Sequence, residues 1–366
     1  MRPRLKPALC RVARDERTLQ FGLHPRHAVL LADLEPEVRH WVESLDGVRD
    51  VAGVLAGAVE AGIGEERGRT LLNLLISRGV VDDAAVGPGP LRGLAMAERD
   101  RLQPDLDALS LAPGTTDGGL SALERRRGAH VRVYGAGRVG AQIVALLAAS
   151  GIGRLCVVDS GRARNRDVVP GGLTWAHVGM SRQDGAVAVA GDLAPSVTAW
   201  TGDHAARPAD GVRPPDLAVL APVEPLDGLL VAELLDWKVP HLLVTAYEGF
   251  GSVGPLVLPG RSTCLQCLDL VRRDRDPGWP VVSARLGGFP AGEVACDTVT
   301  STTVAAMAAG HALALIDGRE SVVTNGTLDV LPDWSWKRRS WSVHPQCRCF
   351  RNNMGSLTMV TSATCS

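Results

Sequence analysis

The chain has 366 residues, which is long enough for two or three domains with sizeable cores. Its 39 Lys and Arg nearly balance its 40 Asp and Glu, so a basic surface for nucleic acid is not expected. The chain lacks an uninterrupted apolar run of membrane-spanning length, and its charged start is not followed by the apolar run of a signal peptide. We therefore expect a cytoplasmic protein without a membrane partner.

The first 86 residues alternate in polarity and then become helical. The expected elements are strands over 9–23 and 27–31, helices over 35–44, 51–61 and 65–78, and a last short strand at Val80-Val81. This order predicts a winged-helix module over residues 1–86. On its third helix, Leu71, Leu74 and Leu75 are expected to face the module's core.

Residues 87–125 contain Gly-Pro-Gly-Pro at 87–90 and a second Gly-rich stretch at 113–119. This composition predicts a linker around one amphipathic segment, Leu94–Leu109. Residues 351–366 are polar and rich in Ser and Thr, which predicts a flexible tail.

A glycine turn, Gly135-Ala-Gly137-Arg-Val-Gly140, lies between the apolar run Val131–Tyr134 and a helical run over 141–149. Asp159 follows 19 residues after Gly140. In dinucleotide-binding units such a turn brings a helix N-terminus to the phosphates, and such an acid binds the ribose. The candidate nucleotide-binding residues are therefore Gly135, Gly137, Gly140 and Asp159. Further strands are expected over 155–158, 217–220, 242–245 and 253–257, so residues 126–350 are predicted to form a doubly wound α/β domain.

Two close pairs of cysteines, Cys264/Cys267 and Cys347/Cys349, lie far apart in the sequence. In a cytoplasmic protein, such pairs favour a structural zinc site with four cysteine ligands over disulfides. Unligated, redox-labile thiols are the alternative.

Cys296 precedes Asp297, which is a candidate cap for a helix ending near Ile316. The helix dipole would lower the pKa of this thiol and favour a nucleophile. A buried structural cysteine is the alternative.

The glycine turn, the stretch Gly151-Ile-Gly-Arg-Leu leading into Val-Val-Asp159, and the thiol pairs resemble the ThiF/MoeB superfamily of ubiquitin-activating-like adenylyltransferases. The resemblance implies a Rossmann-like fold, ATP as a cofactor and a homodimer. Active members carry Asn-Leu-x-Arg-Gln after the acid, then a lysine, and later an aspartate that helps to hold magnesium. Here the Asn-Leu-x-Arg-Gln motif cannot be identified after Asp159. Arg182 stands at the lysine position, and the strand 217–220 runs into Ala221-Pro-Val-Glu224. A domain that has lost adenylation is therefore expected, with Arg182 and Cys296 as weak catalytic candidates.

Motifs in the first 86 residues, including Leu19-Gln-Phe-Gly22, resemble the PqqD-like recognition element of ribosomal peptide pathways. With Asp276-Pro-Gly-Trp-Pro280, the whole chain resembles the ThiF-like partners of YcaO cyclodehydratases, which serve azole (thiazole/oxazole-modified microcin) and thiopeptide pathways. The resemblance implies that the module binds a precursor leader as an added strand and presents the precursor to a separate YcaO enzyme. Arg67, Arg69, Leu71 and Arg78 are the candidate peptide-binding residues, with a solvated basic face as the alternative for the arginines.

Two other functions remain open. One is an ATP-dependent adenylyltransferase that activates a peptide carboxylate. The other, a nicotinamide dehydrogenase, rests only on the glycine turn and Asp159. The Ser/Thr/Cys-rich tail is either substrate-like or a plain extension.

Overall fold

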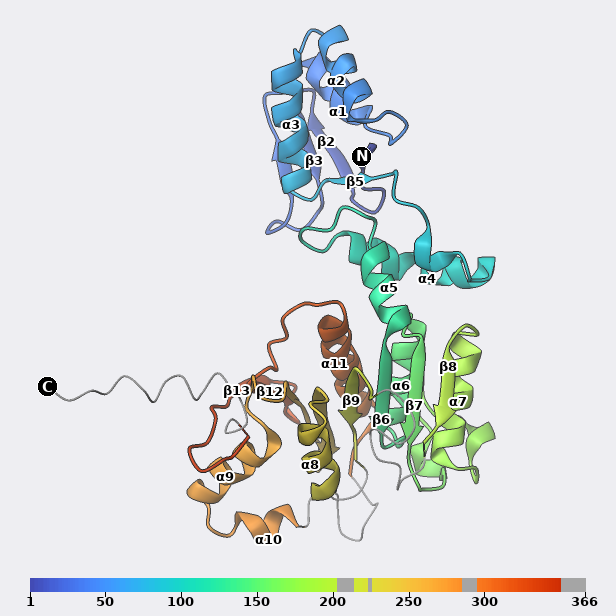
Figure 1. Cartoon of the computed structure of the whole chain (residues 1–366), viewed down its shortest axis with the longest axis vertical. Helices are drawn as coiled ribbons and strands as arrows, with labels where there is room; N and C mark the ends of the chain where they lie inside the picture. The colour runs from blue at the N-terminus through green and yellow to red at the C-terminus, as the bar shows by residue number, and fades with distance from the viewer. Residues whose placement is uncertain (203–213, 223–225, 285–294, 350–366) are drawn as a thin grey trace, which may run out of the picture. The chain divides into compact units, whose positions relative to one another are not determined.

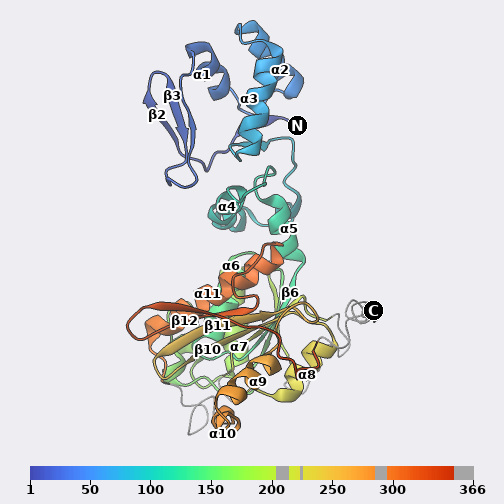
Figure 2. The same cartoon turned by 90° about the vertical axis from the view of Figure 1, so that its left-hand side faces the viewer.

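The computed structural model describes residues 1–202, 214–222, 226–284 and 295–349. The chain divides into two units, Met1–Arg125 and Arg126–Ser366, each of which is considered by itself (Figures 1 and 2). The elements of the first unit are β1 Pro3–Leu5, β2 Arg11–Asp15, β3 Thr18–Phe21, β4 Val29–Leu31, α1 Pro36–Glu43, α2 Val51–Glu60, α3 Glu65–Ser77, β5 Val81–Asp83, α4 Met96–Ser110 and α5 Leu120–Gly128.

The first unit contains two small antiparallel sheets, β2-β3-β4 and β1-β5. The single strand expected over 9–23 is a hairpin instead. Its turn is closed by the Asp15 carboxylate, which accepts the N–H of Arg17 at 2.8 Å. Short polar side chains that bond the backbone two residues on are typical of tight turns.

Helix α3 has two sides of different character. Leu72 and Leu75 are buried in the core beside Trp41, whose indole donates to Val54 O at 2.9 Å. Leu71 only borders that core, and Leu74 is 39% exposed. The prediction that Leu74 faces the core is therefore wrong, because the helical period turns Leu72 inward and Leu74 outward.

The stretch 87–125 holds two helices, α4 and α5, and buries several leucines. It is joined to the start of the chain by Lys6, which is 1% exposed. The Lys6 ammonium donates to Ser110 O and to Thr115 O (2.7 Å) and lies 3.3 Å from an Asp82 carboxylate oxygen. Burial raises the pKa of Asp82, and the ammonium opposes that rise. Residues 110–116 are thus hydrogen-bonded to the N-terminal elements, since Thr116 O also accepts the Asp83 N–H.

The second unit is an eight-stranded sheet with helices on both faces. Its elements are β6 His130–Tyr134, α6 Gly140–Ala149, β7 Arg154–Val158, α7 Arg182–Leu193, β8 Thr198–Thr201, β9 Leu217–Leu220, α8 Gly228–Asp236, β10 His241–Tyr247, β11 Phe250–Val257, α9 Leu265–Arg275, α10 Trp279–Ser283, α11 Thr298–Ile316, β12 Gly326–Val330 and β13 Trp336–Ser340, with short 3-10 turns at Asn165–Asp167 and Trp175–His177. The strand order is β13-β12-β11-β10-β9-β6-β7-β8, with β10-β9-β6-β7-β8 parallel and β11, β12 and β13 antiparallel. This arrangement confirms the predicted doubly wound α/β class.

The two faces of the sheet have separate cores. Helices α6, α7 and α11 pack on one face, and α8 and α9 on the other (Figure 2). By length and composition α11 could cross a membrane, but it packs against α6, β10 and β11 in the core. The strand order switches at β6: β7 and β8 follow on one side of it, and β9 and β10 on the other. In doubly wound folds, ligands bind at this switch point, here between β6 and β9.

Candidate functional site

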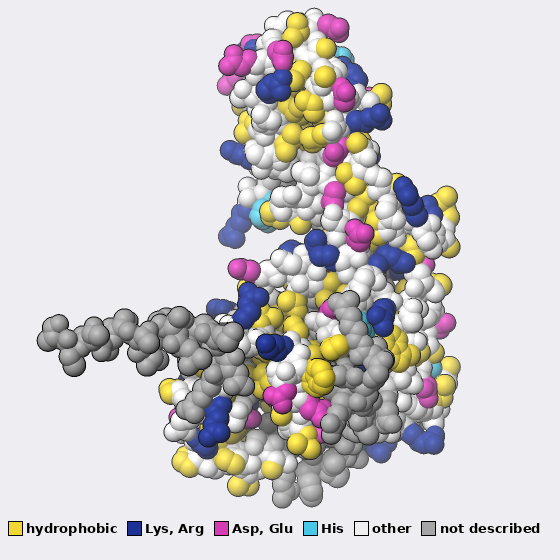
Figure 3. All heavy atoms as spheres, viewed as in Figure 1, with side chains coloured by type: hydrophobic (Ala, Val, Ile, Leu, Met, Phe, Trp, Pro, Cys, Tyr) yellow, Lys and Arg dark blue, Asp and Glu magenta, His cyan; other side chains and the backbone are white. Residues whose placement is uncertain are grey.

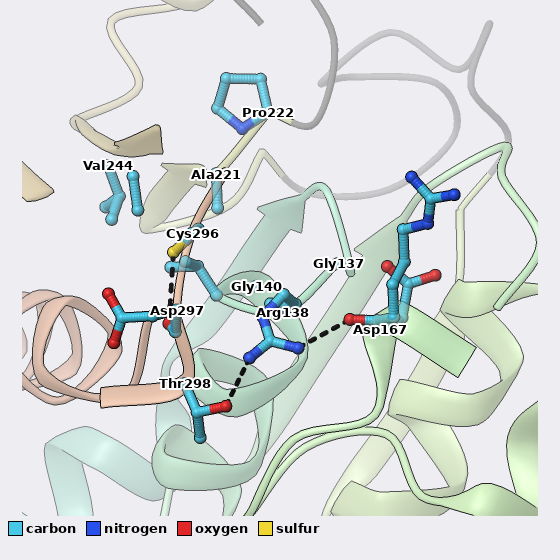
Figure 4. A pocket seen from close by; sticks show the side chains of 13 residues that line it. Gly137, Arg138, Gly140, Asp167, Ala221, Pro222, Val244, Cys296, Asp297 and Thr298 are labelled. Carbon is cyan, nitrogen blue, oxygen red and sulfur yellow. Dashed lines mark hydrogen bonds between the residues drawn. The ribbon is translucent and has the colours of Figure 1, made fainter. Parts of the chain in front are cut away.

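A cavity of about 380 Å³ lies at the carboxyl ends of β6, β9 and β10, where the sequence predicts a nucleotide site (Figure 4). The glycine turn, the loop after β7, the loop after β9 and the start of α11 surround it. Its lining consists of Gly137, Arg138, Val139, Gly140, Arg166, Asp167, Ala221, Pro222, Val244, Ala246, Cys296, Asp297 and Thr298. Asp159 and Arg182 are not among the lining residues.

The glycines of the turn are required by the packing of the backbone itself. Gly135 has a φ of +93°, and a Cβ there would lie 2.0 Å from Ala221 O. A Cβ on Gly140 would lie 1.8 Å from Gly135 O. Because these contacts are internal to the fold, the motif would be needed whether or not a nucleotide binds.

Asp159 is fully engaged by the protein. One carboxylate oxygen accepts the Gly161 N–H at 2.7 Å and the other accepts the Ala136 N–H at 2.7 Å. The Arg182 guanidinium adds contacts of 2.9 to 3.1 Å to both oxygens. The predicted lysine replacement therefore forms an ion pair with the predicted ribose ligand.

Arg138, the fourth residue of the glycine motif, joins three segments of the cavity wall (Figure 4). Its guanidinium donates to Arg166 O (2.7 Å) and Val168 O (3.3 Å), and to the Thr298 hydroxyl (2.7 Å). Arg138 is not among the residues predicted from the sequence to form the site. Its position in the sequence could have drawn attention to it. A glycine-rich turn normally lets a phosphate approach the backbone, so a long charged side chain such as that of Arg138 is unexpected there.

Cys296 lies at the cavity wall and is partly buried. Asp297 caps α11 as predicted, accepting the N–H groups of Val299 and Thr300 at 2.9 Å each. The expected pKa shift is wrong in sign, however. Burial raises the pKa of the Cys296 thiol to about 11, so at neutral pH it is protonated and a poor nucleophile.

The cavity does not match the requirements of an ATP–magnesium complex. Ala221 and Pro222 occupy the wall where the metal-binding aspartate of active superfamily members is expected, and Glu224 lies outside the described residues. Asp167 lines the cavity, but one of its oxygens accepts the Arg164 N–H at 2.8 Å. Among the described residues, these contacts and the Asp159–Arg182 pair leave the cavity without the ribose carboxylate and without an aspartate at the expected metal position.

The four predicted thiols converge on one point beneath the α8/α9 face of the sheet. The sulfur atom of Cys264 lies 3.7 Å from that of Cys267 and 3.5 Å from that of Cys347, and the sulfur of Cys267 lies 3.6 Å from that of Cys349. All four lie within 4.8 Å of one another. A tetrahedral zinc with Zn–S bonds of about 2.3 Å separates its sulfurs by about 3.8 Å, so the cluster is compatible with zinc bound by four thiolates.

The surroundings of the thiols fit a structural role. Burial raises the pKa of Cys264 to about 12, so its deprotonation at neutral pH needs a cation. His344, close before Cys347, bonds to an Asp274 oxygen at 2.8 Å and thereby holds the C-terminal segment against α9. The site has no open ligand position for a substrate if all four thiols bind.

The predicted peptide-binding residues lie along α3 in the N-terminal unit. Arg67 pairs with Glu35 at 2.8 Å and Arg69 with Glu65 at 2.6 Å, both at the surface. Arg78 is exposed and has no ion-pair partner among the described residues. Hydrophobic side chains are visible on the face of this unit that carries α3 (Figure 3).

The ThiF family model matches residues 112–349, which is more than half of the chain. The chain therefore belongs to the ThiF family, as the glycine motif, the Asp159 strand and the thiol pairs predicted.

Two solved proteins share its fold over nearly the whole length. Escherichia coli MccB bound to succinimide has a TM-score of 0.73 at 14% identity and covers 96% of this chain and 100% of its own. MccB has also been solved with ATP, at a TM-score of 0.71, 13% identity and coverage of 96% and 100%. PaaA has a TM-score of 0.70 at 18% identity, with coverage of 92% of this chain and 99% of its own. None of the curated proteins matches the chain.

Proposed function

We propose that this protein binds the leader of a ribosomally made precursor peptide and presents the precursor to a separate YcaO cyclodehydratase in the cytoplasm. In this proposal the second unit is a zinc-stabilised scaffold that docks the enzyme and does not adenylate. Holding the leader would raise the effective concentration of the core peptide at the partner's active site.

The observation that carries the proposal is the apolar edge of the small sheet in the N-terminal unit. The two edges of β2-β3-β4 differ: β2 is charged and almost fully exposed, whereas β4 is Val29-Leu30-Leu31, with Leu30 48% exposed. Val29 and the α3 residue Leu71 border the same core. An extended peptide can pair with the β4 edge and place apolar side chains against Leu71 and Leu74.

The likeness to MccB supports the peptide-binding part. MccB is described as a microcin C7 biosynthetic enzyme and was solved with N-formylated MccA, and that structure covers 96% of this chain at a TM-score of 0.72. The shared fold extends over the N-terminal unit. Because identity is 14%, the likeness establishes the fold, and the ligand remains part of the proposal.

Arg78 suits the acidic side chains of a leader because it is exposed and unpaired among the described residues. Arg67 and Arg69 would first have to exchange their glutamate partners. Such surface pairs are worth about 0–1 kcal/mol, so an acidic peptide could replace either glutamate at little cost.

The test uses fluorescein-labelled synthetic leaders of the short Cys/Ser/Thr-rich peptides encoded in the same genome, each titrated with the full-length protein in fluorescence polarisation. Leu74→Glu should weaken binding by about 10-fold or more, because it places a charge against an apolar contact. Leu229→Glu is the matched control, since Leu229 is 75% exposed and lies in the second unit. Absence of leader binding by the unmodified protein would refute the proposal.

The second candidate is an ATP-dependent adenylyltransferase, and the full-length likeness to an ATP-bound MccB structure favours it. The occupied Asp159 and the apolar Ala221-Pro222 wall count against it. Pyrophosphate exchange with purified protein and precursor separates the two. Pyrophosphate exchange would support the adenylyltransferase. The leader-binding function would be supported if the leader binds without exchange and the precursor is cyclised only after a YcaO enzyme is added.

A further inference from the structure

The Asp159 carboxylate has its hydrogen-bonding capacity filled from within the chain. A carboxylate offers about four lone-pair directions. The Gly161 and Ala136 N–H groups take one on each oxygen, and the Arg182 fork reaches both oxygens. The Asp159 side chain is 4% exposed, so solvent does not compete for it.

Arg182 is held in place as firmly as the acid. Its side chain is 12% exposed, and a second nitrogen lies 4.0 Å from an Asp167 oxygen. The adjacent Gly161 is fitted to the guanidinium: a Cβ on Gly161 would lie 2.1 Å from the Arg182 Nη2 atom. Gln183, the next residue, accepts the Asp159 N–H at 2.9 Å. The absence of a side chain at Gly161 thus leaves space for the Arg182 guanidinium. An arginine that donates from two nitrogens holds a carboxylate more strongly than the point charge of a lysine.

The Asp159–Arg182 ion pair lies outside the cavity at the glycine turn. The lining includes the glycine turn and Asp167 but neither Asp159 nor Arg182. A nucleotide would need to extend from the helix N-terminus at Gly140 to a ribose-binding carboxylate. Here the Arg182 guanidinium lies against that carboxylate, and neither residue lines the cavity.

We infer that Arg182 is a specificity-determining residue that closes the ribose half of the cleft and excludes adenine nucleotides from this ThiF-family chain. The inference concerns the second unit and holds whether or not the N-terminal unit binds a leader. Its test therefore contains no peptide, and its failure would leave the leader-binding measurement unaffected.

The experiment is isothermal titration of the full-length protein with AMP and with ATP, each with magnesium. The unmodified protein should give no saturable binding into the millimolar range. Arg182→Ala removes the fork and opens Asp159, so AMP should now bind saturably, with a Kd about 10- to 100-fold below the highest concentration titrated against the unmodified protein, the range that charge-assisted hydrogen bonds imply. Arg162→Ala is the matched control. It removes the same charge from the loop that precedes α7, where Arg162 donates to Gly179 O at 2.9 Å, and should leave AMP binding unchanged.

Saturable ATP or AMP binding by the unmodified protein would overturn the inference. So would a folded Arg182→Ala protein, verified by circular dichroism, that gains no affinity. If Arg182→Ala does not fold, Arg182→Lys replaces it. Lysine keeps the charge but lacks the second donor nitrogen of the guanidinium, which weakens the contact with Asp159, so a gain in AMP affinity over the unmodified protein is again expected, and its absence counts against the inference.

Discussion

The buried ion pair between Lys6 and Asp82 makes a quantitative prediction about the N-terminal unit. Lys6→Met keeps most of the aliphatic side chain but removes the ammonium, leaving the Asp82 carboxylate, 1% exposed, without its cation. Breaking a buried pair from one side costs about 3–5 kcal/mol. This is a large part of the roughly 5–15 kcal/mol that typically stabilises a domain.

The assay is hydrogen exchange by mass spectrometry on the full-length protein, followed at Asp83, whose N–H donates to Thr116 O. The expected loss of stability corresponds to exchange that is about 150 to 5,000 times faster. Lowering the pH should reduce the deficit. Burial holds the pKa of Asp82 above its usual value, so stability is regained as the pH falls through the folded-state pKa toward the unfolded one.

Two variants distinguish the buried charge from a general effect of mutation. Lys6→Met combined with Asp82→Leu removes both charges and should recover most of the lost stability, since apolar replacements of buried pairs are often neutral. Arg69→Ala breaks a pair whose side chains are more than half exposed and should cost less than about 0.5 kcal/mol. If folded Lys6→Met exchanges as slowly as the unmodified protein, the reasoning is refuted.

Three further predictions concern the second unit. The purified protein should hold about one zinc per chain by elemental analysis, and Cys264→Ser should lower both the metal content and the melting temperature; an unchanged melting temperature would contradict a structural zinc. Burial lowers the pKa of His241 to about 4 from 6.5, so stability is fully present above about pH 6.5 and is lost as the pH falls toward 4, by about 3 kcal/mol in urea unfolding. His241→Asn should weaken this pH dependence of the unfolding free energy. If the variant and the unmodified protein lose stability equally between pH 6.5 and 4, His241 is not the group responsible. Gly140→Ala should cost at least about 2 kcal/mol in the same assay, because its Cβ would lie 1.8 Å from Gly135 O, and a neutral result would contradict the close packing of the turn.

The central strands could be predicted because they are buried on both faces. β9 and most of β7 are continuous apolar runs, β6 is apolar apart from His130 and Arg132, and all three were predicted within a residue of their observed bounds. β8 (Thr198–Thr201), β12 (Gly326–Val330) and β13 (Trp336–Ser340) were missed. β8 and β13 are edge strands with partly or fully exposed residues, and β12 carries Gly326, Thr327 and Asp329, so all three lack the apolar pattern on which such predictions depend.

The stretch 87–125 shows how composition can mislead. Its Gly and Pro content predicts a linker, yet α4 within it buries Leu102, Leu106 and Leu109. The amphipathic segment was predicted at nearly the right place. Its packing was not, because the contact with Lys6 joins residues about a hundred positions apart and cannot be inferred from local pattern.

In the candidate sites, too, the features set by local sequence could be predicted and those set by the fold could not. The cysteine spacing was sufficient to predict which four thiols come together, since close pairs of ligands are a local feature. The pairing of Arg182 with Asp159 depends on how the loop after β7 folds back on the start of α7, and sequence alone does not give that geometry. The direction of the Cys296 pKa shift was predicted wrongly for a related reason. The helix dipole can be inferred from local sequence, whereas the burial that raises the pKa depends on the whole fold.

The exposed strand β13 has a consequence for how copies of this chain behave at high concentration. It forms one edge of the eight-stranded sheet, and its five residues are all exposed. Lys337, Arg338 and Arg339 follow one another along it. Arg339 pairs with Asp329, but two copies that met edge to edge would still bring Lys337 and Arg338 of each chain together, and this repulsion opposes the open-ended sheet growth that bare edges permit.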